Sequence, residues 1–293
     1  MPFTIRELSL EDQKHVDQLC ETIWSGNDYV PTEFSKWVSD PLSITLGVFE
    51  AEELVAIGNI EKLDGSNIAW IQGLRVREEH RGKGHGTSVT LALIELARDM
   101  SIQHLWYATS SRNEASMKVA EKCGFHIADR TGYFRIYQPY PVHSQPSPSI
   151  IPMNVNPERL HELLIENPEL VESKTFPLAW HFDFKTPEGL TRLLSDAVVK
   201  TVVDDSGKVQ GLYCLIERQR QEETTAAFTV FATDRSVFVD IMSRMIDLAE
   251  ARGADRAVFF LGPRVTEWAP NLGYVADEFI DRTFLLYELN PTK

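Results

Sequence analysis

The stretch Leu74–Val89 reads LRVREEHRGKGHGTSV, and the rest of the chain of 293 residues can be interpreted outward from it. Residues 68–76 are rich in β-branched and aromatic side chains, which predicts a strand. From Val89 onward, apolar residues recur every three or four positions, which predicts an amphipathic helix. Between them lies a loop of glycines and basic residues, Arg81, Gly82, Lys83, Gly84 and Gly86. Glycine lets backbone N–H groups approach a ligand, and a helix N-terminus favours anions, so we expect a phosphate group here.

The glycine spacing distinguishes between phosphate-binding motifs. A dinucleotide-binding loop, G-x-G-x-x-G, would need its third glycine at position 87, where the chain has Thr87. A G-x-x-x-x-G-K-[S/T] loop is absent, because nothing of that spacing precedes Lys83. Arg81, Gly84 and Gly86 fit R-x-x-G-x-G instead, after a strand that ends in Leu-x-Val. The alternative is a glycine-rich strand-to-helix turn that binds no ligand.

Length and composition narrow the classes of function. A chain of 293 residues is long for one core and suggests two domains. The net charge of −14 argues against a nucleic-acid or anionic-membrane partner and is compatible with amine substrates. Three widely spaced cysteines imply neither a disulfide framework nor a zinc knuckle, so a reducing compartment is expected. With no apolar run of membrane-spanning length and no signal-peptide pattern, we expect a cytoplasmic protein.

Strands and helices alternate through the first half of the chain. Strands are predicted at residues 3–8, 44–50, 54–63, 68–76, 104–110 and 134–137. Helices are predicted after Ser9 as far as Trp24, over residues 32–38, from the glycine loop to Met100, and over residues 114–122. The order β-α-α-β-β-β-α-β-α-β predicts an α/β layer sandwich with mixed strand pairing.

The second half repeats the first in degraded form. A proline- and serine-rich linker ends near residue 149, and the motif CGFHIAD at 123–129 is echoed by LGYVAD at 272–277. The predicted strand 225–231 matches 68–76, but the connection after it, ATDRS at 232–236, has no glycine and one acidic residue. We therefore expect a duplicated fold whose second copy has lost its phosphate loop. The alternative is chance similarity of short segments.

Two motifs in the first half resemble the GCN5-related N-acetyltransferase (GNAT) superfamily over roughly residues 3–139. One is the R-x-x-G-x-G loop; the other is Asn113, Ser116 and EKCGF at 121–125, similar to the N-x-x-A…E-K-x-G-F segment of that family. The resemblance implies an α/β fold of two tandem acyl-CoA N-acyltransferase-like sandwiches with mixed sheets, the second one degenerate. The expected domains are an acetyltransferase domain at 1–139, a linker at 140–149 and a degenerate GNAT-like domain at 150–293.

The resemblance also implies acetyl-coenzyme A (acetyl-CoA) as the acyl donor. Its pyrophosphate would be held by the backbone of the loop, which comprises Arg81, Gly82, Lys83, Gly84, His85, Gly86 and Thr87. Leu74, Arg75 and Val76 would lie where the strand binds the pantetheine arm and polarises the acetyl carbonyl. Asn113 and Ser116 would lie beside the same arm.

The chain departs from the family at two catalytic positions. Ala120 stands where the family often has a tyrosine that protonates the thiolate, and Gln72 and Gly73 replace the usual carboxylate. An alkylamine has a pKa of about 10.4, so a base is usually needed near neutral pH. The candidate replacements are Asp28, Glu61 and Tyr107, with Tyr29 as a further possibility, although each could be structural.

The loop histidines, His80 and His85, could bind phosphate, act as a base or simply be solvated. Their spacing makes no metal site, and no metal is expected. Cys123 is expected to be a small buried side chain rather than a nucleophile.

A narrower resemblance concerns the acyl acceptor. The stretch IWSGNDYVP at 23–31, with Trp37 and with GLRV at 73–76, is similar to the vertebrate N-acetylhistidine synthetase group. This resemblance implies that Asp28, Tyr29 and Gln72 contact the acceptor, whose ammonium or imidazole could lie on aromatic rings. The alternative is that Asp28 caps a turn and Trp37 belongs to the core.

The sequence leaves two classes of function open. One is an N-acetyltransferase acting on a small-molecule amine, for which an acceptor pocket at the domain junction could use Trp180, His181 and Asp183. A protein N-acetyltransferase would be a variant of it. The other is a non-catalytic acyl-CoA sensor, which the replacements at Ala120 and Gln72 favour. The oligomeric state, monomer or homodimer, is also left open.

Overall fold

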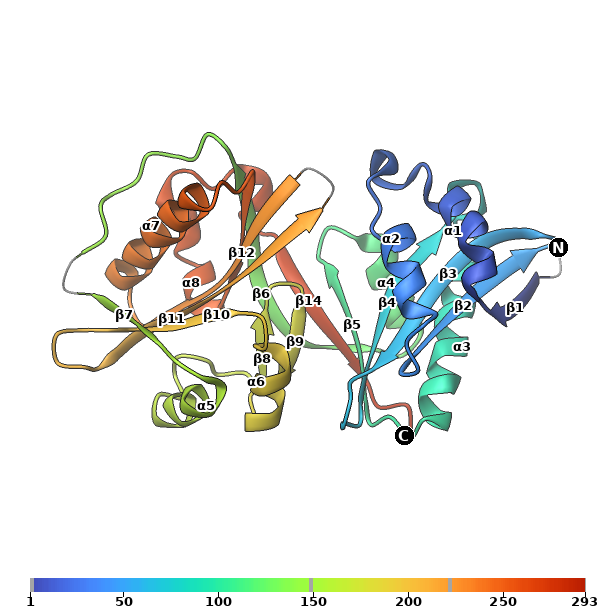
Figure 1. The fold of residues 1–293 in the computed structure, drawn as a ribbon, viewed down its shortest axis with the longest axis horizontal. Coiled ribbons are helices and arrows are strands. Elements are labelled where there is room, and N and C mark those ends of the chain that lie inside the picture. The colour runs from blue at the N-terminus through green and yellow to red at the C-terminus, as the bar shows by residue number, and fades with distance from the viewer. Residues whose placement is uncertain (1–2, 148–149, 221–222, 293) are drawn as a thin grey trace. The chain divides into compact units, whose positions relative to one another are not determined.

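A computed structural model describes residues 3–147, 150–220 and 223–292, apart from the side chains of residues 24 and 25. Two compact units make up the chain (Figure 1). We call them the first unit, residues 1–109, 113–128 and 286–293, and the second unit, residues 110–112 and 129–285. The expected domain bounds of 1–139 and 150–293 differ from these units, because the stretch 129–139 belongs to the second unit and the stretch 286–293 to the first.

A sheet forms the centre of the first unit. Its strands follow one another in the order β1-β2-β3-β4-β5, and the carboxyl-terminal end of β14 lies next to β5. All pairings from β1 to β4 are antiparallel, whereas β4 and β5 are parallel. The strands are β1 Phe3–Glu7, β2 Ser43–Glu50, β3 Glu53–Lys62, β4 Ile68–Val76, β5 His104–Ser110 and β14 Thr283–Leu289.

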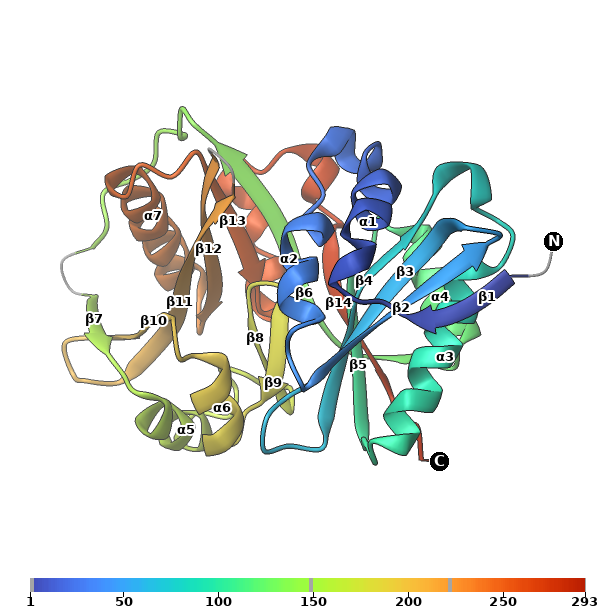
Figure 2. The ribbon, with the colours of Figure 1, turned by 45° about the vertical axis from the view of Figure 1, so that its right-hand side comes forward.

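Helices cover both faces of this sheet (Figure 2). They are α1 Gln13–Cys20, α2 Val30–Trp37, α3 His85–Asp99 and α4 Glu114–Lys122, with short 3-10 helices at Leu10–Asp12, Ile23–Gly26 and Glu78–His80. On one face, α1 and α2 bury Val16, Phe34 and Trp37 with apolar residues of β2 and β3. On the other face, Val89 and Leu93 of α3 pack against β3, where a Cβ added to Gly58 would lie 3.0 Å from Cδ1 of Leu93.

The second unit repeats the strand order of the first. Its sheet runs β7-β10-β11-β12-β13-β6, with β12 and β13 parallel and the other pairs antiparallel. The strands are β6 His126–Tyr137, β7 Ile151–Asn154, β10 Val198–Val203, β11 Val209–Arg220, β12 Glu223–Ala232 and β13 Arg256–Leu261. A small separate sheet pairs β8 Thr175–Leu178 with β9 His181–Phe184. The helices are α5 Pro157–Glu166, α6 Pro187–Leu193, α7 Arg235–Ala251 and α8 Pro263–Thr266.

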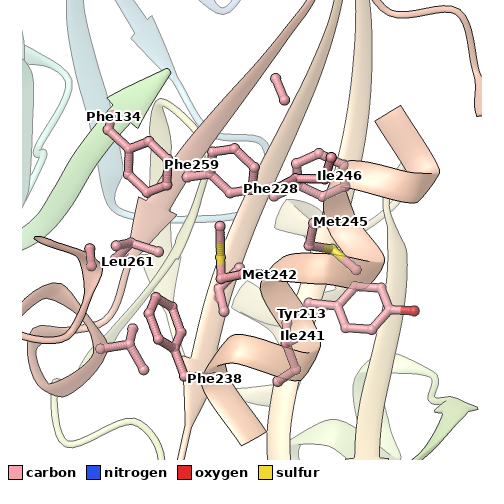
Figure 3. Packing of buried hydrophobic residues seen from close by; sticks show 14 of the residues in the cluster. Phe134, Tyr213, Phe228, Phe238, Ile241, Met242, Met245, Ile246, Phe259 and Leu261 are labelled. Atoms are coloured by element: carbon pink, nitrogen blue, oxygen red, sulfur yellow. The ribbon is translucent and has the colours of Figure 1, made fainter. Parts of the chain in front are cut away.

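An aromatic and methionine-rich core lies between α7 and the second unit's sheet (Figure 3). The ring of Phe259 stacks on Phe134 at a centroid distance of 4.6 Å and on Phe228 at 5.3 Å. Met242 and Met245 of α7 complete the packing, because their flexible thioether chains fill the gaps that rigid rings leave. The second unit therefore has a hydrophobic core of its own.

The mixed α/β fold that the sequence predicts is confirmed, and β4, β5 and α4 have the predicted bounds. Other elements differ at their ends: α3 begins at His85, so Thr87 lies in its first turn rather than in the loop. That turn is polar and carries no periodic apolar signal. The predicted linker packs on the second unit, where Tyr140 donates a hydrogen bond to the Ala254 carbonyl at 2.7 Å. Its last two residues, 148 and 149, lie outside the described residues.

Candidate active site

A bulge in β4 marks the centre of the site. Ile57 pairs with Arg75 and Asn59 pairs with Gln72, so Gly73 and Leu74 together lie opposite Gly58. Gly73 has a φ of +66°, and an added Cβ would lie 2.5 Å from the ring of Trp37. Only glycine fits both the backbone and the space at this position.

Just before the bulge, β4 parts from its parallel neighbour β5. The pairing of β4 with β5 begins at Ile68 with His104 and ends at Ile71 with Tyr107, although β4 continues to Val76. From Gln72 to Val76 the edge of β4 therefore has no partner strand in β5. Unpaired backbone donors and acceptors of a strand edge can hydrogen-bond an extended ligand.

The glycine loop begins where this open edge ends. After the 3-10 helix Glu78–His80, Gly82 and Gly84 have φ values of +77° and +92°, and added Cβ atoms there would meet nothing within 4 Å. Gly84 is the N-cap of α3, and no side chain caps this helix. Its first N–H groups can therefore bind an anion, and the exposed side chains of Arg81 and Lys83 add positive charge.

Neighbouring β4 residues point to opposite faces of the sheet. Val76 lies against α3, where it approaches Gly86, whereas Arg75 reaches the α1–α2 side. There, Nε and Nη2 of Arg75 donate to the two carboxylate oxygens of Asp28 at 2.6 and 2.7 Å. The Asp28 side chain is 1% exposed, and its Oδ1 also accepts from the Val30 N–H at 3.2 Å.

This ion pair lies beside the aromatic residues of the α1–α2 segment. The Arg75 guanidinium lies 5.0 Å from the centre of the Tyr29 ring, and Tyr29 meets Trp37 edge-on at 6.1 Å. The structure thus brings Asp28, Tyr29 and Arg75 together. The Asp28 carboxylate is already paired with the Arg75 guanidinium. The Arg75 side chain therefore points to the α1–α2 side and not to the glycine loop. The side chains of residues 24 and 25, which are part of the narrower resemblance, lie outside the described residues.

Glu61 and Gln72 form a second polar pair on neighbouring strands. Nε2 of Gln72 donates to Oε2 of Glu61 at 2.5 Å. Burial raises the pKa of Glu61 above its ordinary value, and the negative charges of Asp40 and Glu33 add to this, although the hydrogen bond from Gln72 opposes it. A carboxylate of raised pKa is a stronger base than one in water.

Tyr107 is the last residue of β5 that pairs with β4. Its hydroxyl forms a hydrogen bond with the hydroxyl of Ser116 in α4. Burial raises the pKa of Tyr107 to about 12, although the hydrogen bond with Ser116 and the charge of Arg75 lower it. The Tyr107 ring also lies 6.5 Å from that of Tyr287, the buried tyrosine of β14. Tyr107 is therefore protonated throughout the physiological pH range and can act as an acid.

The remaining residues of the α4 motif have local structural roles. Asn113 is the N-cap of α4, and its Oδ1 accepts from the Ser116 N–H at 3.2 Å. Ala120 is buried one helical turn after Ser116, on the same face of α4. Cys123 is buried, and burial raises the pKa of its thiol, which disfavours a nucleophilic role.

The two loop histidines converge on a carboxylate that the sequence reasoning did not include. Nε2 of His85 lies 2.8 Å from Oε1 of Glu50, and Nδ1 of His80 lies 3.3 Å from Oε2 of the same residue. The pKa of Glu50 is below its ordinary value: burial opposes this, but the charges of His80, Lys83 and His85 prevail. His85 is 3% exposed, so only its backbone is within reach of a phosphate.

Sequence reasoning missed several polar residues near the site because their partners are far away in the chain. Asn59 is fully buried, and its Oδ1 accepts from the hydroxyls of Ser43 and Thr45, while its Nδ2 has no acceptor among the described residues. The burial of Asn59 and its register opposite Gln72 become visible only in the structure. Trp180, His181 and Asp183 lie in the second unit, where Asp183 accepts two hydrogen bonds from Arg192.

Comparison with known proteins identifies the first unit. Residues 10–125 match the model of the "Acetyltransferase (GNAT) family". An uncharacterized N-acetyltransferase of Bacillus subtilis (strain 168), YobR, is 31% identical over 85 residues, which cover 29% of this chain and 34% of that protein. A histidine N-acetyltransferase of Oreochromis niloticus is 27% identical over 74 residues, which cover 25% of this chain and 22% of that protein. The matches thus span about a third of YobR and about a fifth of the histidine enzyme.

Solved structures extend the likeness to the second unit. A tandem GNAT protein from the clavulanic acid biosynthesis pathway superposes with a TM-score of 0.62 at 12% identity, covering 99% of both chains. None of the helices in the described part of the chain has the length and apolar character needed to span a membrane. Residues 10–125 are therefore a domain of the acetyltransferase (GNAT) family, and the chain as a whole has the fold of a tandem GNAT protein.

Proposed function

We propose that the first unit transfers the acetyl group of acetyl-CoA to the amine of a small molecule, an amino acid such as histidine being the first candidate. The observation that carries this proposal is the parting of β4 from β5 after Ile71 and Tyr107, next to the uncapped N-terminus of α3. An open strand edge that leads to an anion-binding helix end fits a long ligand with a pyrophosphate at one end.

The residues of the loop and of β4 fit acetyl-CoA, which supplies the acetyl group as a thioester when bound. The backbone of Gly82, Gly84 and the first turn of α3 would bind the pyrophosphate, with Arg81 and Lys83 as counter-charges. The open edge at Leu74–Val76 would bind the pantetheine arm, and a backbone N–H there would stabilise negative charge developing on the acetyl oxygen. Asn113 and Ser116 remain proposed contacts of the same arm.

Glu61 is the group that we propose as the general base. It is partly buried, its pKa is raised, and Gln72 fixes one of its oxygens. In this role it removes a proton from the acceptor's ammonium group, directly or through a water molecule, so that the neutral amine can attack. Asp28 is a weaker candidate, because both of its oxygens are already bound by Arg75.

Tyr107 is the group that we propose as the general acid. Its hydroxyl contacts Ser116, one turn from Ala120 on the same face of α4. The hydroxyl thus lies near the place where the family's tyrosine would emerge from that helix. A tyrosine with a pKa of about 12 keeps its proton near neutral pH, and it can donate that proton in a hydrogen bond to the sulfur as negative charge develops there.

The acceptor would lie on the α1–α2 side of β4. Tyr29, Trp37 and the pair of Arg75 with Asp28 offer aromatic faces and a fixed positive charge, while Glu61 and Gln72 offer a carboxylate and an amide. Charges of both signs within one small region suit a zwitterionic amine better than a simple alkylamine. The likeness to histidine N-acetyltransferases supports an amino acid acceptor.

The experiment is an acetyl-transfer assay that follows release of free coenzyme A with a thiol reagent. The twenty amino acids, polyamines, an aminoglycoside and a lysine-containing peptide are tested singly. Release with an amino acid that disappears in Glu61→Gln supports the proposal. Release with the peptide alone would assign a protein acetyltransferase, and bound coenzyme A without release with any acceptor would favour a sensor.

A further inference from the structure

Three potential metal ligands converge beside the glycine loop. Glu50 ends β2, His80 lies in the 3-10 helix after β4, and His85 is the first residue of α3. One ligand atom from each, a carboxylate oxygen and two imidazole nitrogens, lies within 4.8 Å of the others. No role in binding or transferring an acetyl group requires this convergence.

The least exposed member of the cluster lacks a satisfactory partner. Nε2 of His85 lies 2.8 Å from Glu50, yet neither ring nitrogen of His85 makes a hydrogen bond of acceptable geometry with any described residue. The His85 side chain is 3% exposed, so water cannot easily compensate. Buried polar atoms without partners are rare and costly, and a ligand that the structure does not include is a common explanation.

The donor set and spacing match a divalent transition metal. Imidazole nitrogens and a carboxylate oxygen bind Zn²⁺ at about 2.0–2.2 Å, so ligand atoms around one ion lie roughly 3.3 Å apart. The two histidine–Glu50 distances are 2.8 and 3.3 Å. Two histidines and one carboxylate leave a fourth position for water, and the imidazoles favour Zn²⁺ over Mg²⁺.

The surroundings supply an outer layer of support. Nε2 of His80, the ring nitrogen farther from Glu50, lies 3.7 Å from Oε2 of Glu53, and Oε1 of Glu53 forms an ion pair with Nε of Arg77 at 3.0 Å. A carboxylate behind a ligating imidazole orients the ring and increases its basicity. The ammonium group of Lys83 would compete with a metal ion for His80, because its Nζ lies 3.4 Å from Nδ1 of that histidine. Lys83 is exposed and flexible, so metal binding can displace it.

We propose that Glu50, His80 and His85 form a binding site for a divalent transition metal such as Zn²⁺. The competing interpretation is an ion-pair cluster in which Glu50 neutralises the histidines and Lys83. The site joins the two ends of residues 81–84, so an ion there would hold the glycine loop in one conformation. This consequence for acetyl-CoA rests on the proposed function, whereas metal binding itself does not.

The test is a calorimetric titration of the untagged, chelator-treated full chain with ZnCl₂, in the absence of coenzyme A. We expect one equivalent of Zn²⁺ per chain and no comparable binding of Mg²⁺. His80→Asn and Glu50→Gln should each weaken Zn²⁺ binding about tenfold or more. His104→Asn is the matched control, because His104 also pairs with a glutamate, Glu288 at 2.5 Å, but lies outside the cluster. It should bind Zn²⁺ like the unmodified chain.

Thermal unfolding gives a second readout, because an ion that binds only the folded chain raises the midpoint. Zn²⁺ should raise it for the unmodified chain and for His104→Asn, but not for His80→Asn. If Glu50→Gln does not fold, the partly buried His80 still provides the test. Absence of Zn²⁺ binding in the micromolar range, or binding that both cluster variants retain, would overturn the proposal in favour of the ion-pair cluster. Neither result depends on whether the chain binds coenzyme A.

Discussion

Helices α3 and α7 follow corresponding strands of the two units, but their N-termini are built differently. In the first unit, residues 77–84 connect β4 to α3, and the N-cap is Gly84, with no capping side chain. In the second unit, only Thr233 and Asp234 connect β12 to α7. The carboxylate of Asp234 accepts hydrogen bonds from the N–H groups of Ser236 and Val237, at 2.8 and 3.1 Å. The N-terminus of α3 is therefore open to an external anion, whereas the N-terminus of α7 already binds the carboxylate of Asp234.

The strands that precede these helices also differ, because β4 leaves part of its edge unpaired and β12 stays paired with its neighbour almost to its end. The pairing of β4 with β5 ends at Ile71 and Tyr107, well before β4 does. The corresponding β12 and β13 stay paired as far as Val230 and Leu261, and the Gly262 N–H adds a bond to the Val230 carbonyl at 3.0 Å. A ligand arm has no exposed strand edge to follow there. Two copies of one fold thus differ in a loop, a cap and a few strand pairs, and we expect only the first copy to bind coenzyme A.

The largest expected effect is that of Gly84→Arg, which should remove coenzyme A binding. The side chain would fill the place of the pyrophosphate, and losing two charge-assisted hydrogen bonds of about 1.5–3 kcal/mol each weakens binding about 100-fold or more. Calorimetry measures the affinity. Gly207→Arg, in a turn of the second unit, is the matched control, because Gly207 also has a positive φ, +83°, and open space around it. Equal affinity in the two variants would refute the loop assignment.

Glu61→Gln should lower kcat about 10²–10⁴-fold without changing coenzyme A binding, because a general base is lost. In the unmodified enzyme, activity should fall as the pH drops through the raised pKa of Glu61, because the base works only when deprotonated. Glu33→Gln removes a charge that raises this pKa, so the acidic limb should move to lower pH. A pH–rate profile of each variant checks this, and an unshifted limb in Glu33→Gln would count against Glu61.

Tyr107→Phe should lower kcat about 10²-fold, because the leaving thiolate loses its proton donor. The ring remains to pack against Tyr287 and Phe125, so the unfolding midpoint should change little. Steady-state kinetics with acetyl-CoA separates kcat from KM. Ala120→Tyr in the Tyr107→Phe background places a hydroxyl where the family often has one. Recovery of activity there would support the acid role, and full activity of Tyr107→Phe alone would exclude it.

Asp234→Ala should have the smallest effect, a loss of about 1 kcal/mol in the free energy of unfolding, because the cap of α7 is lost. The pKa of Asp234 is lowered in the folded chain: burial opposes this, but the hydrogen bonds from Val237 and Ser236 prevail. Its stabilisation is therefore present above the ordinary carboxyl pKa and is lost as the pH falls through the lowered value. Denaturant unfolding at neutral and acidic pH checks this. If Asp234→Ala gained a coenzyme A site, removal of the cap alone would be sufficient for binding. That result would contradict the role that we assign to the continued pairing of β12 with β13.

Local signals explain what could be predicted from the sequence. The bounds of α4 follow from the cap at Asn113 and from Gly124, and the loop at Gly82 and Gly84 is recognisable because it needs a positive φ twice. The absence of a phosphate loop before α7 was also predictable, since Asp234 is a strong N-cap residue.

Partners distant in sequence explain what could not be predicted. The pairing of Asp28 with Arg75, the meeting of Glu50 with two histidines and the packing of Tyr287 beside Tyr107 each join segments that periodicity treats separately. The placement of β6 next to β13 is of the same kind, because a strand's pattern shows which faces are apolar but not which strand lies beside it.

The most direct test of the difference between the two units is the stoichiometry of coenzyme A binding to the full chain, measured by calorimetry. The open start of α3 and the self-capped start of α7 predict one equivalent per chain. Two equivalents per chain, or one equivalent that survives Gly84→Arg, would contradict this account and place a coenzyme A site in the second unit.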